Sequence, residues 1–149
     1  MKSKKNKISL SRPSSSSDSM KVNLKKAKRN ERFTFNFSFI TDDKKYSLSG
    51  LESKDRKIHK KLLLTIERLS KMDKTSVYIL PKEQGIEQLS EAEVSFRINS
   101  EFVRTGRNDE IGEGFWIFRL NDLGRVIGKI NDNVFYILAI DTSFSTYKH

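Results

Sequence analysis

The sequence predicts an α+β fold in which one main helix packs on a mostly antiparallel sheet of five or six strands. Three observations carry this prediction. Phenylalanines alternate with polar residues from Phe33 to Phe39, which is the period of a half-buried strand. Apolar residues recur at helical spacing between residues 53 and 72. The last segment, residues 115–149, divides into three short apolar stretches separated by two turn sequences.

Positive charge is concentrated at the N-terminus. Residues 1–32 hold eleven Lys and Arg and two acids, whereas residues 33–149 hold eighteen bases and seventeen acids. Residues 1–31 are rich in Lys and Ser and poor in apolar residues, so we predict a disordered basic tail followed by a single domain over residues 32–149. The tail is either a solvated segment without a role or an electrostatic tether to nucleic acid or a membrane surface. Because the body is nearly neutral, a nucleic-acid site on it must be a local patch.

Composition and missing motifs exclude several classes of protein. The chain has no cysteine and two histidines, His59 and His149, so disulfides and thiolate metal sites are excluded and no metal site or cofactor is expected. No apolar run is long enough to span a bilayer, and no hydrophobic segment follows the N-terminal lysines as in a secretion signal. We therefore expect a cytoplasmic protein without membrane contact. The P-loop, the dinucleotide-binding glycine fingerprint, HExxH and GxSxG are all missing.

In the first half of the chain, the pattern predicts a strand, a turn and the main helix. The phenylalanines of residues 33–39 are expected in the core, residues 42–45 form a turn, and residues 46–51 form a short strand or an irregular link. Ser53 is expected to cap a helix that ends near Met72. The lysines on its polar side are either a solvated surface or an addition to an RNA-binding face. The apolar side of this helix is formed by Ile58, Leu62, Ile66 and Leu69.

The second half predicts two further strands before the final block. Residues 75–80 (TSVYIL) are predicted to form a strand or an extended segment ended by Pro81. Residues 94–98 alternate apolar and polar side chains, which predicts another strand. Residues 82–93 are expected to form a polar loop or short helix, and residues 101–114 a long polar connection. The final block predicts three strands with the sequences FWIFRL, RVIGKI and VFYILAID, and places Trp116 in the core.

The final block also brings together side chains that can act on a phosphate. Arg119 and Arg125 flank the first turn, and the chain ends in Tyr147, Lys148 and His149. If the turn places Leu120 opposite Arg125, the two arginines face opposite sides of the sheet. A three- or five-residue loop, or a bulge, places them on the same side.

The order of elements, a strand, a helix and an antiparallel meander with a short polar end, resembles the RelE/ParE toxin superfamily. The detailed likeness is to RelE/YoeB-like ribosome-dependent messenger-RNA endonucleases, in which an aromatic-rich strand carries an arginine, a second arginine opens the next strand, and a Tyr or His follows the last strand. Arg119, Arg125 and Tyr147 or His149 occupy those places. The detailed match covers about a quarter of the chain.

The resemblance implies the toxin of a toxin–antitoxin pair, with messenger RNA on the ribosome and an antitoxin protein as partners. The implied reaction is metal-free cleavage of RNA by its own 2′-hydroxyl, without a cofactor. Arg119 and Arg125 would hold the phosphate, since guanidinium groups pair with phosphate oxygens and stay charged. His149 or Tyr147 would move a proton, or Tyr147 would stack on a base. Glu83 or Glu87 would be the carboxylate base.

Two other functions stay open at this stage. One is a noncatalytic module that binds nucleic acid through the tail and protein through the sheet, and the other is a ParE-like gyrase inhibitor with the same fold. Each candidate residue also has a purely structural interpretation. Arg125 would be a solvated hairpin residue, Tyr147 would pack its ring on the sheet, and His149 would be a disordered chain end.

Overall fold

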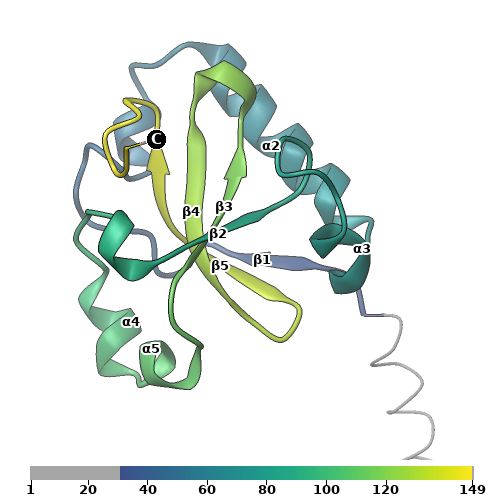
Figure 1. The fold of residues 1–149 in the computed structure, drawn as a ribbon. Helices are drawn as coiled ribbons and strands as arrows, with labels where there is room; N and C mark the ends of the chain where they lie inside the picture. Colours follow the sequence, from purple (N-terminus) through teal and green to yellow (C-terminus); the bar gives the residue numbers. More distant parts are fainter. Residues whose placement is uncertain (1–30, 149) are drawn as a thin grey trace, which may run out of the picture. The chain divides into compact units, whose positions relative to one another are not determined.

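The computed structural model describes residues 31–148 and confirms the α+β fold class. A single sheet of five strands forms its centre, with the strand order β1-β5-β4-β3-β2. Neighbouring strands are antiparallel except that β1 is parallel to β5 (Figure 1). The predicted disordered tail lies outside the described residues except for Glu31, and so does His149. The strands are β1 (Thr34–Asn36), β2 (Glu87–Leu89), β3 (Phe115–Arg119), β4 (Arg125–Asn131) and β5 (Val134–Asp141).

The predicted C-terminal meander is confirmed as β3, β4 and β5. A five-residue loop joins β3 to β4, closed by a hydrogen bond from the Leu120 amide to the Gly124 carbonyl. Asn121 in this loop and Asp132 in the next turn have left-handed backbone angles, with φ of 58° and 54°. Asn and Asp tolerate this conformation better than other residues with a side chain, which is why these two positions reverse the chain.

Helix α2 (Arg56–Ser70) covers one face of the sheet and confirms the predicted main helix. Its buried residues Ile58, Leu62 and Leu69 pack in a cluster with Phe118 and Phe135, which come from the strands. The predicted cap residue was wrong, because Asp55 rather than Ser53 is the N-cap. The Asp55 carboxylate accepts a hydrogen bond of 2.9 Å from the amide of Lys57, satisfying one of the free donors of the first turn.

The two candidate cap residues can be separated by mutation. Asp55→Ala should lower the free energy of unfolding by about 1 kcal/mol, because the Lys57 amide loses its acceptor. Ser53→Ala is the matched control and should change it by less than about 0.5 kcal/mol, the usual range for an exposed position. Urea unfolding followed by circular dichroism measures both. Equal effects of the two substitutions would contradict the capping role of Asp55.

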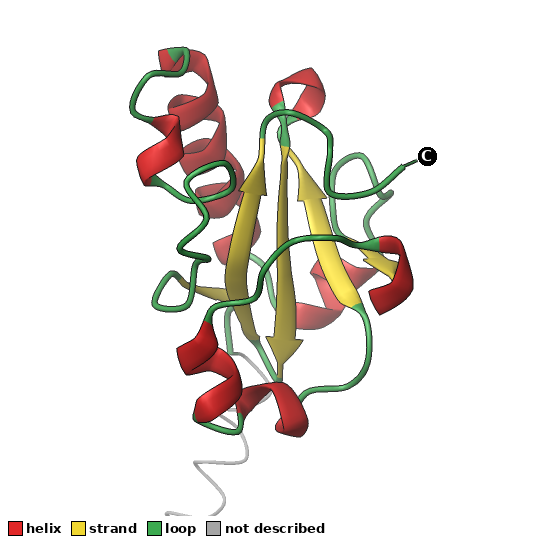
Figure 2. Cartoon of the chain, turned by 90° about the vertical axis from the view of Figure 1, so that its left-hand side faces the viewer, coloured by secondary structure: helices red, strands yellow, loops and turns green. Residues whose placement is uncertain are grey.

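The opposite face of the sheet is covered by short helices and loops. Helices α4 (Ser100–Arg104) and α5 (Arg107–Glu110) follow one another there, and Phe102 of α4 is fully buried. Phe102 belongs to a second apolar cluster with Phe115 and Ile117, whose side chains alternate along β3 with those that face α2. Figure 2 shows the strands flanked by helices on both sides. Two apolar layers therefore hold the sheet, one on each face.

Three segments predicted as strands or extended differ from the structure wholly or in part. Residues 75–80 contribute to α3 (Lys74–Tyr78), a short helix whose cap Asp73 accepts a 2.8 Å hydrogen bond from the Ser76 amide. Residues 94–98 belong to no strand and contain a bend at Phe96, although Ser95 donates a backbone hydrogen bond of 2.7 Å to Thr146. The strand predicted over residues 33–39 is only β1, three residues long, and Phe37 beyond it is 39 % exposed.

Some predicted connections contain regular structure. Strand β2 lies within residues 82–93, which were predicted to form a loop or a short helix. The connection predicted over residues 101–114 contains α5 and most of α4. Residues 46–51 form an irregular link rather than a strand, with a 3₁₀ turn over Ser49–Leu51. Within residues 31–148, no helix has both the length and the apolar character required to cross a bilayer.

Candidate functional site

The β3–β4 hairpin places Arg119 and Arg125 on the same face of the sheet. Their Cα atoms are directly opposite one another in the ladder. Directly opposed residues of an antiparallel pair project their side chains to one side. The five-residue loop, Leu120 to Gly124, produces this register. Of the two arrangements left open by the sequence, the structure has the one with both arginines on the same face.

Arg119 forms an ion pair with Glu87 across the β2–β3 ladder. Glu87 is opposite Ile117, so its side chain lies on the same face as that of Arg119, two residues further along β3. The Nε and Nη2 atoms of Arg119 donate hydrogen bonds of 3.1 Å and 3.0 Å to Glu87 Oε1. Both side chains retain contact with solvent, with exposed fractions of 28 % for Arg119 and 17 % for Glu87.

Arg125 is buried, which rules out the solvated hairpin interpretation. Only 2 % of the residue is exposed, and its Nε lies 3.6 Å from a carboxylate oxygen of Asp141. The guanidinium also donates a 3.2 Å hydrogen bond to the Tyr147 carbonyl and lies 3.5 Å from the centroid of the Tyr147 ring. The ring of Phe144 is 5.0 Å away. Arg125 therefore fastens the C-terminal segment to the sheet through charge, hydrogen bonding and cation–π contact.

Asp141 completes this arrangement. It is fully buried at the end of β5 and accepts hydrogen bonds from both the amide and the hydroxyl of Ser143 and of Thr146, at 2.7–3.0 Å. Burial acts to raise the pKa of Asp141, but the hydrogen bonds from Thr146 and Ser143 outweigh it and leave the pKa below its ordinary value. The carboxylate is therefore charged at neutral pH and neutralises Arg125.

Tyr147 packs its ring against the sheet, as the structural interpretation of this residue predicted. It is 5 % exposed and belongs to the apolar cluster that contains Phe102 and Phe115. Its backbone carbonyl and its ring both contact Arg125, so the prediction that these two residues lie close together is confirmed. His149 is outside the described residues. A base cannot stack on the Tyr147 ring unless the C-terminal segment moves.

A small hollow lies between the two arginines. Its volume is about 40 Å³, which is close to the size of one small anion rather than a nucleotide. Of the two carboxylates predicted as a base, Glu87 contacts Arg119 beside this hollow, whereas Glu83 is exposed in the loop before β2. The hollow is lined by Arg119, Asn121, Gly124, Arg125, Phe144 and Tyr147.

The cluster therefore joins a half-buried carboxylate, an accessible arginine and a buried arginine on one face. This set can bind an anionic oxygen at Arg119 and accept a proton at Glu87. In the part of the chain that the structure describes, no three His, Asp or Glu side chains are grouped so that they could hold a metal ion.

The sequence reasoning missed Asp141 and Phe144. A signal for Asp141 was present, because an aspartate that ends an apolar strand and precedes Ser143, Ser145 and Thr146 is typical of a turn closed by side-chain to backbone hydrogen bonds. The pairing of Asp141 with Arg125 carried no local signal, since it depends on the β4–β5 register, in which these two residues are opposite one another.

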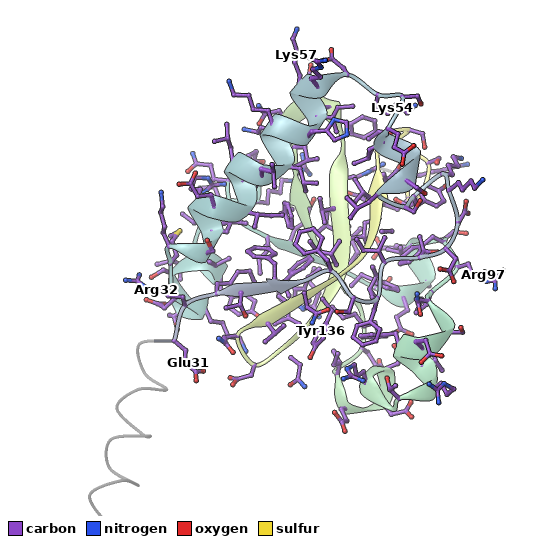
Figure 3. The ribbon with its side chains drawn as sticks, turned by 180° about the vertical axis from the view of Figure 1, so that it is seen from behind. Glu31, Arg32, Lys54, Lys57, Arg97 and Tyr136 are labelled. Atoms are coloured by element: carbon purple, nitrogen blue, oxygen red, sulfur yellow. The ribbon has the colours of Figure 1, made fainter. Side chains whose placement is uncertain are left out.

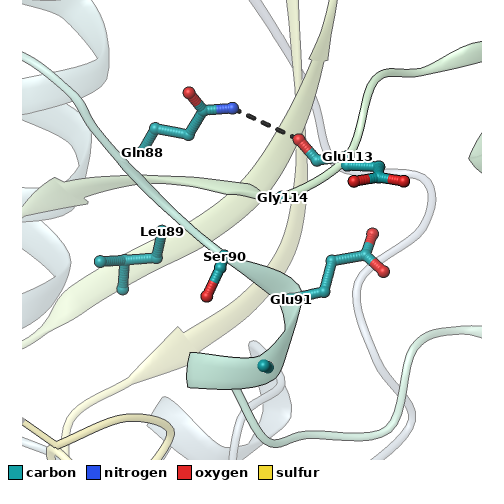
Figure 4. Close-up of a pocket in the computed structure, with 7 residues that line it drawn as sticks. Gln88, Leu89, Ser90, Glu91, Glu113 and Gly114 are labelled. Atoms are coloured by element: carbon teal, nitrogen blue, oxygen red, sulfur yellow. Dashed lines mark hydrogen bonds between the residues drawn. The ribbon is translucent and has the colours of Figure 1, made fainter.

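A larger cleft of about 610 Å³ lies apart from the arginines, beside β2 (Figure 4). Gln88 on its wall donates a 3.3 Å hydrogen bond to the Glu113 carbonyl. Glu91, also on the wall, pairs at 2.6 Å with the buried ammonium group of Lys129, which holds the pKa of Glu91 below its ordinary value through a hydrogen bond and its charge. Among the described candidates for the active site, none lines this cleft; these are Glu83, Glu87, Arg119, Arg125 and Tyr147.

Comparison with known proteins adds no assignment, since no protein-family model, curated protein or solved structure matches this chain.

Proposed function

We propose that this chain is a RelE-type toxin that cleaves messenger RNA on the ribosome without a metal ion and is inhibited by an antitoxin protein. The observation that carries the proposal is the Glu87–Arg119 pair, which shares one sheet face with Arg125 and the C-terminal segment. The element order supports it as well, because a strand and a helix precede an antiparallel meander of β2 to β5.

The proposed reaction uses Glu87 and Arg119 as the catalytic residues. An RNA phosphate takes the place of Glu87 as the partner of Arg119, which releases the carboxylate. Glu87 then removes the proton of the 2′-hydroxyl, and the 2′-oxygen forms a bond to the adjacent phosphorus. The bond from phosphorus to the 5′-oxygen breaks, and this oxygen receives a proton. Arg119 stabilises the negative charge that develops on the phosphate.

Arg125 acts as a positioning residue in this scheme. Its charge is neutralised by Asp141 and its surface is covered by Tyr147, so it does not touch substrate in the described conformation. It holds Tyr147, which lines the same small hollow as Arg119. The proton for the leaving 5′-oxygen would come from the end of the chain, where the sequence places His149.

A noncatalytic RNA-binding module is the second candidate, and one observation favours it. Both arginines of the cluster are ion-paired, with Glu87 and with Asp141, and Tyr147 is buried. Structural ion pairs of this kind occur without catalysis. The two functions differ in whether the protein breaks RNA.

Induction in a bacterial host separates them. The expected result for the wild-type chain is growth arrest with transcripts cut inside their coding regions, mapped by sequencing of RNA 5′ ends. Arg119→Ala should restore growth at equal protein level. Arg104→Ala, which removes an exposed arginine paired with Glu101 on α4, is the matched control and should remain toxic. Growth arrest with intact transcripts would reject the nuclease and leave the second candidate or the ParE-like gyrase inhibitor.

A further inference from the structure

One flank of α2 carries a row of positive charge. Its members follow the helical repeat at positions i, i+3, i+4, i+7, i+11 and i+14, and the row extends about 21 Å along the helix at 1.5 Å per residue. The single uncharged position is Leu64. We name this row the basic stripe, which consists of Lys57, Lys60, Lys61, Leu64, Arg68 and Lys71.

The basic stripe is turned away from the core. The buried face of α2, formed by Ile58, Leu62 and Leu69, packs against the sheet. Figure 3 shows α2 from this outer side, with Lys57 pointing away from the body. Among residues 31–148, Lys57, Lys60 and Lys61 make no salt bridge, so their charges are not neutralised locally.

The charge of the whole body is polarised around this helix. Residues 53–72 hold seven bases and two acids, a balance of +5. The remainder of residues 33–149 holds eleven bases and fifteen acids, a balance of −4. The charges of the body therefore sum to nearly zero, but they are unevenly distributed, and the positive potential is concentrated on α2. By contrast, the arginines of the candidate active site are matched by Glu87 and Asp141.

The first described residues of the body lie beside the same helix. Arg32 donates a hydrogen bond to the Lys71 carbonyl, and the Phe33 amide donates one of 2.8 Å to the Met72 carbonyl. Residues 1–31 carry ten further bases and two acids. Arg32, at the start of the described body, lies at the C-terminal end of the basic stripe, where Figure 3 labels it.

We infer that the basic stripe is a docking surface for the phosphate backbone of RNA, on the opposite sheet face from Arg119. Lysine ammonium groups spaced by one helical turn contact successive phosphates and release condensed counterions. The choice of RNA over DNA rests on the proposed function. A membrane surface fits less well, because an interfacial helix inserts a whole apolar face, and that face of α2 is used by the core. Only Leu63 and Leu64 remain exposed among the apolar residues of α2.

Binding of a fluorescein-labelled RNA duplex of 20 base pairs, measured by anisotropy over a range of salt concentrations, tests the inference with the full chain. A duplex probes the backbone and is not the single-stranded substrate of the proposed reaction. Replacing Lys57, Lys60 and Lys61 together by Gln should weaken binding about tenfold at 0.1 M salt and lower the salt slope by about 2–3. Replacing Lys44, Lys45 and Lys82 by Gln removes the same charge elsewhere and should have a smaller effect on both.

A gain-of-charge pair provides the converse test. Leu64→Lys completes the basic stripe and should tighten RNA binding, whereas Leu63→Lys adds the same charge about 100° around the helix and should tighten it less. The inference would be overturned if the two triple Lys→Gln variants weakened RNA binding equally and the two Leu→Lys variants tightened it equally. It would also be overturned if substitutions in the basic stripe changed binding to a DNA duplex, or to vesicles containing phosphatidylserine, and left RNA binding unchanged. The docking surface is measured by binding of the RNA duplex to the α2 variants, and the cleavage proposal by cutting of transcripts with Arg119→Ala, so failure of the cleavage proposal and failure of the docking surface give different results.

Discussion

Asp141→Asn should lower the free energy of unfolding by about 3–5 kcal/mol, because it leaves the buried Arg125 guanidinium without its counterion. The residue is fully buried, and its carboxylate also accepts the hydrogen bonds that fold the segment up to Thr146. Asn retains one acceptor oxygen but has no charge and cannot accept all of these bonds. Urea unfolding at pH 7 measures the loss.

Asp132→Asn is the matched control, because Asp132 is exposed in the β4–β5 turn, where Asn adopts the same left-handed backbone. Its free energy of unfolding should change by less than about 0.5 kcal/mol. A similar small change in Asp141→Asn would mean that the ion pair with Arg125 does not stabilise the fold, and the role of Arg125 in holding the C-terminal segment would be lost with it.

The same carboxylate predicts a dependence on pH. Its pKa in the folded protein is lowered, and a group of this kind adds stability above its unfolded pKa of about 3.9. That contribution is lost as the pH falls through the folded pKa. The difference in unfolding free energy between wild type and Asp141→Asn should therefore be constant from pH 7 to about pH 5 and shrink below about pH 4. A difference that shrinks already between pH 7 and pH 6 would contradict this assignment.

Arg119→Ala should reduce the rate of RNA cleavage by about 10²–10³-fold, the usual cost of removing one group that stabilises charge in the transition state. Glu87→Gln should reduce it by about 10²–10⁴-fold, since the amide cannot accept the 2′-hydroxyl proton. Both side chains are partly exposed, so neither substitution should unfold the protein. Single-turnover cleavage of messenger RNA on programmed ribosomes measures the rates.

Arg125→Lys distinguishes positioning from direct contact. Lysine keeps the charge but loses the planar group that lies on the Tyr147 ring and donates to the Tyr147 carbonyl. If Arg125 positions the C-terminal segment, this variant should lose both stability and cleavage. If Arg125 holds phosphate directly, cleavage should fall while stability is retained, and the positioning role would be rejected.

The elements with a strong local signal were predicted correctly. Helix α2 has a complete apolar stripe, and the C-terminal meander combines apolar strands with turn residues such as Asn121 and Asp132. The failures are short segments whose local pattern does not decide the structure. Residues 75–80 have β-branched and aromatic side chains, but the capping carboxylate of Asp73 starts a helix just before them. Strand β2 has little apolar pattern, because it forms the edge of the sheet next to β3.

In the candidate site, too, the sequence predicted the contacts between nearby segments but not the contacts that depend on strand pairing. The proximity of Arg119, Arg125 and Tyr147 follows from a hairpin and a chain end that are close in sequence. The partners of the arginines do not, since Glu87 is 32 residues from Arg119 and reaches it only through the β2–β3 ladder. Burial of Arg125 likewise depends on Phe144 and Tyr147 folding back over it.

The most direct test of the proposed chemistry is the structure of the RNA ends after cleavage on the ribosome. Attack by the 2′-oxygen predicts an upstream fragment ending in a 2′,3′-cyclic phosphate and a downstream fragment with a 5′-hydroxyl, and no cleavage where a 2′-deoxynucleotide precedes the scissile phosphate. Both products should disappear with Arg119→Ala and persist with Arg104→Ala. A 5′-phosphate on the downstream fragment, cleavage of the 2′-deoxy substrate, or intact RNA with the wild-type protein would contradict the account.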